Sequence, residues 1–274
     1  TVDVGTVSVD GDAPDLSSVA ATNGAYGIGD TLSITVTWDE TVVVSGTPTL
    51  TLSNNDVASY VSGSGSTALV FTTAVAEGDT DSSDLQVSSY SGTITDAAGG
   101  AAAAASGDLG SVTVDGDTPD IATITATDGA YGVGDTLSIT VTFDQAVDVS
   151  GTPTLTLSNG DTASYASGTG NAAIVFSTTI AETDTASSDL AVTAINSAGG
   201  TIQDAHDNDY SSALSGAGDL GTVTVDGDAP DFIAVTATDG AYGVGETLSI
   251  TAIWDEAVVV SGTPTLTLSN GDTA

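Results

Sequence analysis

The side chains of this sequence that could do chemistry are almost all carboxylates. Its 274 residues contain 37 Asp and Glu, no Lys, Arg or Cys, and one His, for a formal net charge of −37. Nucleic-acid and P-loop sites need cationic side chains against phosphate, and an anionic membrane surface would repel this chain. Without Cys there is no thiolate nucleophile, no disulfide and no Cys-based zinc site. We therefore expect a protein that acts through acids, hydroxyls, amides and apolar packing.

The acids recur in a short linker motif, Asp-Gly-Asp-Xaa-Pro-Asp, which occurs three times. Its Pro fixes φ and stiffens the segment. Three carboxylates so close together repel one another unless a cation lies between them, and calcium takes about six to eight oxygen ligands. We therefore expect several calcium ions at the linkers, against the alternative that the acids are simply solvated surface. The candidate ligands are Asp10, Asp12 and Asp15, then Asp115, Asp117 and Asp120, and then Asp226, Asp228 and Asp231.

A second group of acids is expected to meet the linkers through the fold. In a β-sandwich, the strand around Ile34 runs toward the end at which the linker enters, and the acidic loop 77–84 lies at the opposite end, facing the next linker. Gln145 replaces Glu40 and Glu256, so the Asp before each of them is the better candidate. Asp56 and Asp161 are expected to be solvated. The added metal candidates are Asp39, Asp144 and Asp255 at strand ends, and Asp79, Asp84, Asp184 and Asp189 in loops.

One more acidic segment, Asp204 to Asp209, contains the only histidine, His206. It lacks the Gly and the terminal Glu of an EF-hand loop. The first repeat has Asp96-Ala-Ala-Gly-Gly at this place. We expect His206 at the surface and keep Asp204 as a candidate ligand of a local calcium site.

Enzymatic activity is not expected. Paired carboxylates can hydrolyse glycosides, but a catalytic pair belongs in one cleft, whereas these acids recur in every repeat. The single histidine lies in an insertion, so the sequence offers no Ser-His-Asp arrangement.

Internal repeats predict how the chain is divided. Gly-Thr-Pro-Thr-Leu-Thr-Leu-Ser-Asn begins at Gly46, Gly151 and Gly262, so the copies are 105 and then 111 residues apart. Self-similarity at such a period indicates repeated domains. We predict the last strand of a preceding repeat at 1–9, complete repeats at 10–114 and 115–225, and the first half of a third at 226–274.

Within a repeat the hydrophobic pattern has period two. Apolar residues alternate with Thr and Ser over 31–38, and shorter alternations follow to 111–114, which predicts half-buried antiparallel strands. Asn159-Gly160 predicts a type I′ hairpin, with Asn54-Asn55 a weaker version. Seven or eight strands in each repeat are typical of an immunoglobulin-like β-sandwich. The expected fold is all-β, with tandem immunoglobulin-like Greek-key β-sandwich repeats in an elongated array and no helix.

Three motifs carry a resemblance to a known family. Asp10–Asp15, Gly27–Leu32 and Gly46–Leu52 resemble the opening segments of bacterial immunoglobulin-like repeats in large extracellular adhesins and surface fibres. In linker chemistry, the chain also resembles the calcium-filled junctions of cadherins. The resemblance implies an extracellular or cell-surface location and a role as a shaft of stacked domains.

The expected function is therefore structural: a segment of an extracellular fibre or giant adhesin, made rigid by calcium at acidic linkers. Its expected partners are further copies of the same repeat in the same chain or fibre. Thr-rich faces offer lateral association between fibres, and neither nucleic-acid binding nor membrane insertion is expected. Two alternatives remain open: an adhesive or ligand-binding module of a cell-surface protein, and a pilus-like subunit assembled by strand donation.

Overall fold

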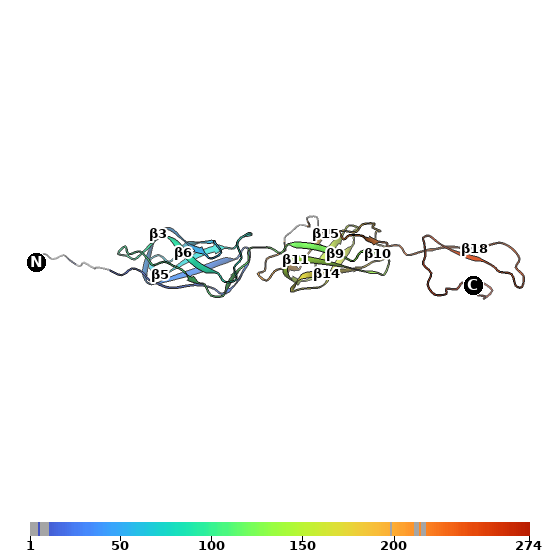
Figure 1. Cartoon of the computed structure of the whole chain (residues 1–274), viewed down its shortest axis with the longest axis horizontal. Helices are drawn as coiled ribbons and strands as arrows, with labels where there is room; N and C mark the ends of the chain where they lie inside the picture. Colours follow the sequence, from blue (N-terminus) through green and yellow to red (C-terminus); the bar gives the residue numbers. More distant parts are fainter. Residues whose placement is uncertain (1–4, 6–10, 198, 211–213, 215–217) are drawn as a thin grey trace.

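The computed structural model describes residues 5, 11–197, 199–210, 214 and 218–274. In this part of the chain there are strands and turns but no helix, so the protein is all-β as expected. Among the residues described, none belongs to a helix long and apolar enough to cross a membrane. Two separate hydrophobic cores form, which we call unit one (residues 16–114) and unit two (residues 121–225). Figure 1 shows them end to end, followed by residues 226–274. The strand predicted at 1–9 lies, except for Gly5, outside the described residues.

Unit one is built from two sheets whose strand order matches the immunoglobulin fold. β1, the first half of β3, β5 and β4 form one sheet, and the second half of β3 pairs with β6, which pairs with β7. These correspond to the ABED and CFG sheets of the immunoglobulin fold. β4 also pairs with β3 and so joins the two sheets at one edge. The strands are β1 (Leu16–Ala21), β2 (Gly24–Tyr26), β3 (Thr31–Leu52), β4 (Val57–Ser62), β5 (Ser66–Ala74), β6 (Gln86–Thr95), β7 (Gly107–Asp108) and β8 (Val112–Val114).

Unit two repeats this pairing. One difference is that Gly151 to Pro153 separate β11 from β12, whereas in unit one the strand predicted at 31–38 continues to Leu52 as the single strand β3. The strands are β9 (Ile121–Ala126), β10 (Gly129–Tyr131), β11 (Thr136–Ser150), β12 (Thr154–Leu157), β13 (Thr162–Ser167), β14 (Asn171–Thr179), β15 (Val192–Asn196), β16 (Thr201–Gln203) and β17 (Val223–Val225). Beyond them lie β18 (Phe232–Ala237) and β19 (Ile250–Trp254), which pair with each other.

The last strand of each unit corrects the expectation that all strands are antiparallel. β8 pairs in parallel with β2, and β17 pairs in parallel with β10. A parallel pair needs a long connection between its strands, and here almost the whole unit supplies it. In unit one, the linker that follows therefore leaves from beside the end of β2, the second strand of the unit.

The alternating residues form the cores as predicted. Leu32, Ile34 and Val36 are buried, as are their counterparts in unit two. One difference between the cores concerns an aromatic residue: Trp38 of unit one lies with Ala102 in its core, whereas Phe143 of unit two packs edge to face on Tyr210, with ring centroids 5.4 Å apart. The smaller Phe143 ring is thus accompanied by the larger Tyr210 side chain at the place that Ala102 occupies in unit one.

The predicted type I′ hairpin is wrong in its turn type. Gly160 has φ of 97°, but Asn159 is not at positive φ, as a type I′ turn would require. Gly160 N–H donates to Leu157 O (3.1 Å) and Leu157 N–H to Asp161 O (2.8 Å). This is a type I turn followed by a left-handed residue, the other common hairpin that Asn-Gly fits. In unit one, Asn55 takes the left-handed place with φ of 76°.

We predict opposite effects of two substitutions at this left-handed place. Gly160→Ala should destabilise unit two by about 1–2 kcal/mol because a Cβ is strained there. Open space surrounds the site, so the cost lies in the backbone alone. Asn55→Gly should stabilise unit one or leave it unchanged. Chemical unfolding of the full chain measures both, and a Gly160→Ala variant as stable as the parent would contradict the turn assignment.

Candidate functional site

The acidic linker between the two units is held at both ends by backbone hydrogen bonds. At its start, Asp115 N–H donates to Tyr26 O (3.0 Å), and Asp117 N–H donates to Asp115 Oδ1 (3.0 Å). At its end, Asp120 N–H donates to Asp144 Oδ1 (3.0 Å), while Asp144 N–H donates back to Asp120 O (2.9 Å). The linker is therefore an ordered segment of about six residues that is continuous with β8 and β9.

Each strand-end Asp meets the linker of its own unit, as predicted. Asp39 Oδ1 accepts from Asp15 N–H at 2.8 Å, and Asp255 Oδ1 accepts from Asp231 N–H at 2.8 Å, in the same way as Asp144 and Asp120. The proximity is confirmed, whereas their role as metal ligands stays a prediction. The carboxylates of Asp12, Asp117, Asp226 and Asp228 lie in exposed linker residues, and Asp10 lies outside the described residues.

The loop that was expected to face the next linker packs directly against it. Gly78 N–H donates to Gly116 O (2.9 Å), and Gly116 N–H donates to Asp81 Oδ1 (3.0 Å). A Cβ on Gly116 would lie 2.5 Å from Asp79 O, so only glycine allows this approach. The Asp79 side chain itself accepts from Ala76 N–H within the loop (2.7 Å).

The corresponding loop of unit two behaves in the same way. Gly227 lies against the backbone of Asp184, whose side chain accepts from Ala181 N–H at 2.8 Å. Asp84 and Asp189 are exposed, and their own N–H groups donate to hydroxyls in the same loop. The structure brings these last two to no linker carboxylate among the described contacts.

Unit two contributes a loop, residues 204–209, that reaches back onto unit one. Asn208 is its central residue and is 3% exposed. Its Oδ1 accepts from Ile28 N–H of unit one (2.6 Å). Its Nδ2 donates to Asp117 O (3.1 Å), to Asp115 O (3.3 Å) and to Asp204 Oδ2 (2.9 Å). One amide side chain thus ties unit one, the linker and unit two together; we call these contacts the Asn208 network.

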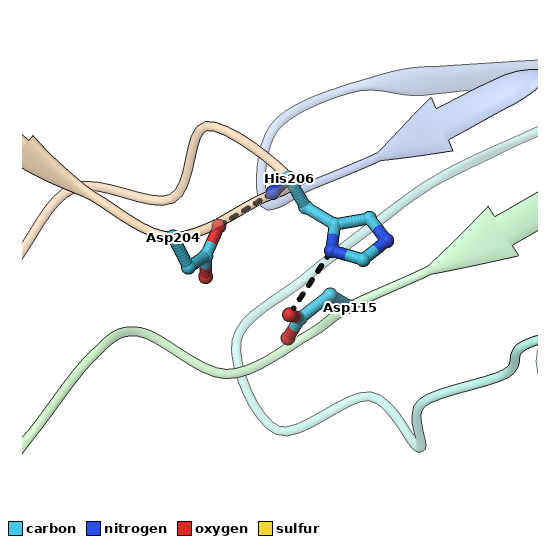
Figure 2. A group of neighbouring side chains, drawn as sticks. All are labelled: Asp115, Asp204 and His206. Atoms are coloured by element: carbon cyan, nitrogen blue, oxygen red, sulfur yellow. Dashed lines mark hydrogen bonds and ion pairs between the residues drawn. The ribbon is translucent and has the colours of Figure 1, made fainter. Parts of the chain in front are cut away.

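His206 joins the same contact, which corrects its expected place at the surface. Its Nδ1 lies 3.2 Å from Asp115 Oδ2, and its Nε2 lies 3.0 Å from Thr113 Oγ1 of β8. The Nδ1 contact is an ion-pair distance without hydrogen-bond geometry, so its attraction depends on a charged imidazole. Figure 2 shows the His206 ring with Nδ1 directed toward the Asp115 carboxylate, and Asp204 bound to the His206 N–H.

The ligand atoms of Asp115, Asp204 and His206 lie within 4.8 Å of one another, close enough for one metal ion. The acceptor capacity of Asp204 argues against that use, because four donors already surround it. Oδ1 accepts from the N–H groups of His206 (2.7 Å) and Asn208 (3.0 Å), and Oδ2 accepts from Asn208 Nδ2 and from Gln145 Nε2 (3.3 Å). Asp204 is therefore better described as a hydrogen-bonded anchor than as an open ligand.

Burial and neighbouring acids change the pKa of a linker carboxylate, that of Asp115. Burial raises the pKa of Asp115 above its ordinary value, and the carboxylates of Asp204 and Asp81 raise it further. The Asp117 N–H and His206 act in the opposite direction. With no Lys or Arg in the chain, no other side chain could neutralise this charge.

Two acids that were expected to be solvated turn out to be half-buried. Asn159 Nδ2 donates to Asp161 Oδ2 (2.8 Å) and to Thr185 O (3.2 Å). Asn54 binds Asp56 in the same way in unit one. Burial raises the pKa of Asp56 and of Asp161, and the neighbouring carboxylates of Asp79 and Asp184 add to the rise.

Comparison with known proteins gives little beyond this description. No family model and no curated protein matches the chain. Among solved structures, the chain is similar to an I-band fragment, I67-I69, of titin, at 9% identity and a TM-score of 0.36 over 95% of this chain and 86% of that one. A likeness of that size does not bear on function, and the fold assignment depends on the strand pairing above.

The linker glycines give a direct test of the joint. Gly116→Ala should push the linker away from the loop at Asp79 and destabilise this contact by about 1–3 kcal/mol, because the clash is with backbone. Faster hydrogen exchange at the Gly78 amide would report it. Gly11→Ala is the matched control, since nothing lies within 4 Å of a Cβ there. Equal exchange in both variants would contradict the packing.

The raised pKa values of three Asp side chains predict how the free energy of unfolding depends on pH. For Asp56, Asp115 and Asp161 the folded chain holds the proton more tightly than the unfolded chain does. In a chelating buffer, the free energy of unfolding should therefore rise as the pH falls from 7 toward about 4–5, and decline as the pH rises. Thermal unfolding at several pH values checks this. A midpoint that falls steadily between pH 7 and pH 5 would contradict it.

Proposed function

We propose that this chain is a load-bearing segment of an extracellular fibre or a large cell-surface adhesin. In this proposal, tandem immunoglobulin-like sandwiches follow one another in an elongated array, and the acidic linkers act as stiff joints between them. Further copies of the same repeat, in the same chain or fibre, are the partners.

The Asn208 network is the observation that carries this proposal. A flexible tether between domains would have a solvated linker and few contacts across it. Here the linker contacts the loop of the preceding unit through Gly116, and a buried amide of the following unit binds three oxygens around it. Such contacts resist bending and twisting, which is what a shaft requires.

Calcium at the linkers is the second part of the proposal. The linker backbone meets acids of both units, since Asp120 N–H donates to Asp144 Oδ1 and Gly116 N–H donates to Asp81 Oδ1, and no Lys or Arg balances their charge. Oxygen ligands of mixed type suit calcium, and weak sites of this kind fill at the millimolar concentrations found outside cells. The outer, Thr-rich strand faces leave room for lateral association between shafts.

The joint can be tested because the chain has no native cysteine. Spin labels on Val61→Cys and Ala166→Cys, at equivalent exposed places in the two units, would report the distance between the units. We expect a narrow distance distribution in the parent. Asn208→Ala should broaden it because three oxygens lose their donor, at about 1–3 kcal/mol each.

The same distance measurement tests how much calcium contributes to the stiffness of the joint. Asp115→Asn together with Asp117→Asn should loosen the joint while circular dichroism shows both units folded. Chelation should broaden the distribution of the parent less than Asn208→Ala does. A broad distribution in the untreated parent would overturn the proposal of a stiff shaft.

A further inference from the structure

Residues 94–102 of unit one and 202–210 of unit two form the same loop. Asp96 N–H donates to Gly100 O (2.9 Å), as Asp204 N–H donates to Asn208 O (3.1 Å). Gly100 N–H in turn donates to Asp96 Oδ1 (2.8 Å), as Asn208 N–H does to Asp204 Oδ1 (3.0 Å). Asp96 and Asp204 are therefore equivalent, and so are Gly100 and Asn208.

The two loops differ in what meets the second carboxylate oxygen. In unit two, Asn208 Nδ2 donates to Asp204 Oδ2. In unit one, glycine stands in that place, and Asp96 Oδ2 is buried with no hydrogen-bond partner among the described residues. Asp96 as a whole is only 4% exposed. A buried carboxylate oxygen without a partner is costly, so it calls for an occupant that the protein itself does not supply.

The surroundings of Asp96 Oδ2 indicate the kind of occupant. A Cβ placed on Gly100 would press on Asp96 Oδ2 and lie 3.3 Å from Asp12 O, so both oxygens border the space beside Gly100. In unit two the equivalent space holds the Nδ2 group, surrounded by Asp204 Oδ2 and the linker carbonyls of Asp115 and Asp117. Asp12 and Asp117 hold the same place in their linkers. Each lies three residues before the linker Asp whose N–H donates to an Asp of the following sheet, Asp15 to Asp39 and Asp120 to Asp144.

We propose that a calcium ion binds beside Gly100, to Asp96 Oδ2 and Asp12 O, in the place that the Asn208 amide fills in unit two. The inference rests on the proposed function, since it assigns one joint cation to a specific place. A carboxylate and a backbone carbonyl are hard oxygen donors, and calcium accepts their irregular arrangement more readily than magnesium does. In unit two, the N–H groups of the Asn208 amide meet the equivalent oxygens, Asp204 Oδ2 and Asp117 O, without an ion.

Because unit one has glycine where unit two has Asn208, the joints in front of the two units are of different kinds. The joint in front of unit one depends on a bound ion at this place, whereas the joint between units one and two carries its own donor. A shaft built from both kinds would soften more at some of its joints than at others when calcium falls.

Calcium titration of the full chain by calorimetry, after removal of metal, tests the site. Asp96→Asn should lose one bound ion per chain. Asp148→Asn, at an exposed acid in β11 away from the linkers, is the charge-matched control and should lose none. Asn208→Gly should gain one ion, because it opens the equivalent place in unit two. The proposal requires the loss and the gain, and either variant binding as many ions as the parent overturns it.

A second variant keeps the test decisive if Asp96→Asn does not fold. Gly100→Asn copies the residue of unit two and retains Asp96, so it should also lose one ion while hydrogen exchange shows unit one intact. An unchanged ion count in a folded Gly100→Asn variant overturns the proposal. The joint between units one and two has no part in this result. A narrow label distance across it with no Asp96-dependent ion would therefore overturn this inference and leave the proposed function standing.

Discussion

The structure depends on how a buried carboxylate is satisfied in a chain that contains no lysine or arginine. An unpaired buried charge is expensive, and the usual remedy of a basic partner is absent here. The protein instead surrounds its acids with backbone N–H groups and side-chain amides. Asp204, with four donors, is the most complete example, and Asp161, held by Asn159, is a smaller one. Asp96 receives two backbone N–H groups on Oδ1, whereas its Oδ2 has no donor among the described residues, and it is there that we propose a bound ion.

This constraint also explains where the joint is strong. In unit one the last strand, β8, runs beside the second strand, β2, and the linker that follows packs on the loop 77–84 through Gly116. The loop 204–209 of unit two contacts unit one as well, through Asn208 at Ile28 and through His206 at Thr113. The contacts that satisfy the acids are therefore the same contacts that hold the two units together. Two units can therefore be held together in a chain without Lys or Arg because amides both bind the acids and cross the joint.

The sequence predicted what depends on local pattern and failed where contact was long-range. The alternation around Ile34 requires only neighbouring residues, and the meeting of Asp39 with Asp15 follows from sandwich geometry. The Asn208 network joins residues about 90 positions apart, and unit one has glycine at the place of Asn208, so neither local pattern nor repeat comparison could predict these contacts. The turn at Gly160 was mistaken because Asn-Gly fits two hairpin types, and only φ separates them.

The most direct measurement of the central claim is the alignment of the two units in solution. Residual dipolar couplings of the full chain report the orientation and the degree of order of each unit separately. If the acidic joint is a stiff connection, a single alignment tensor will describe the amides of units one and two together, with equal magnitude in both. Tensors of clearly different magnitude for the two units would show that they move independently, and would contradict the account.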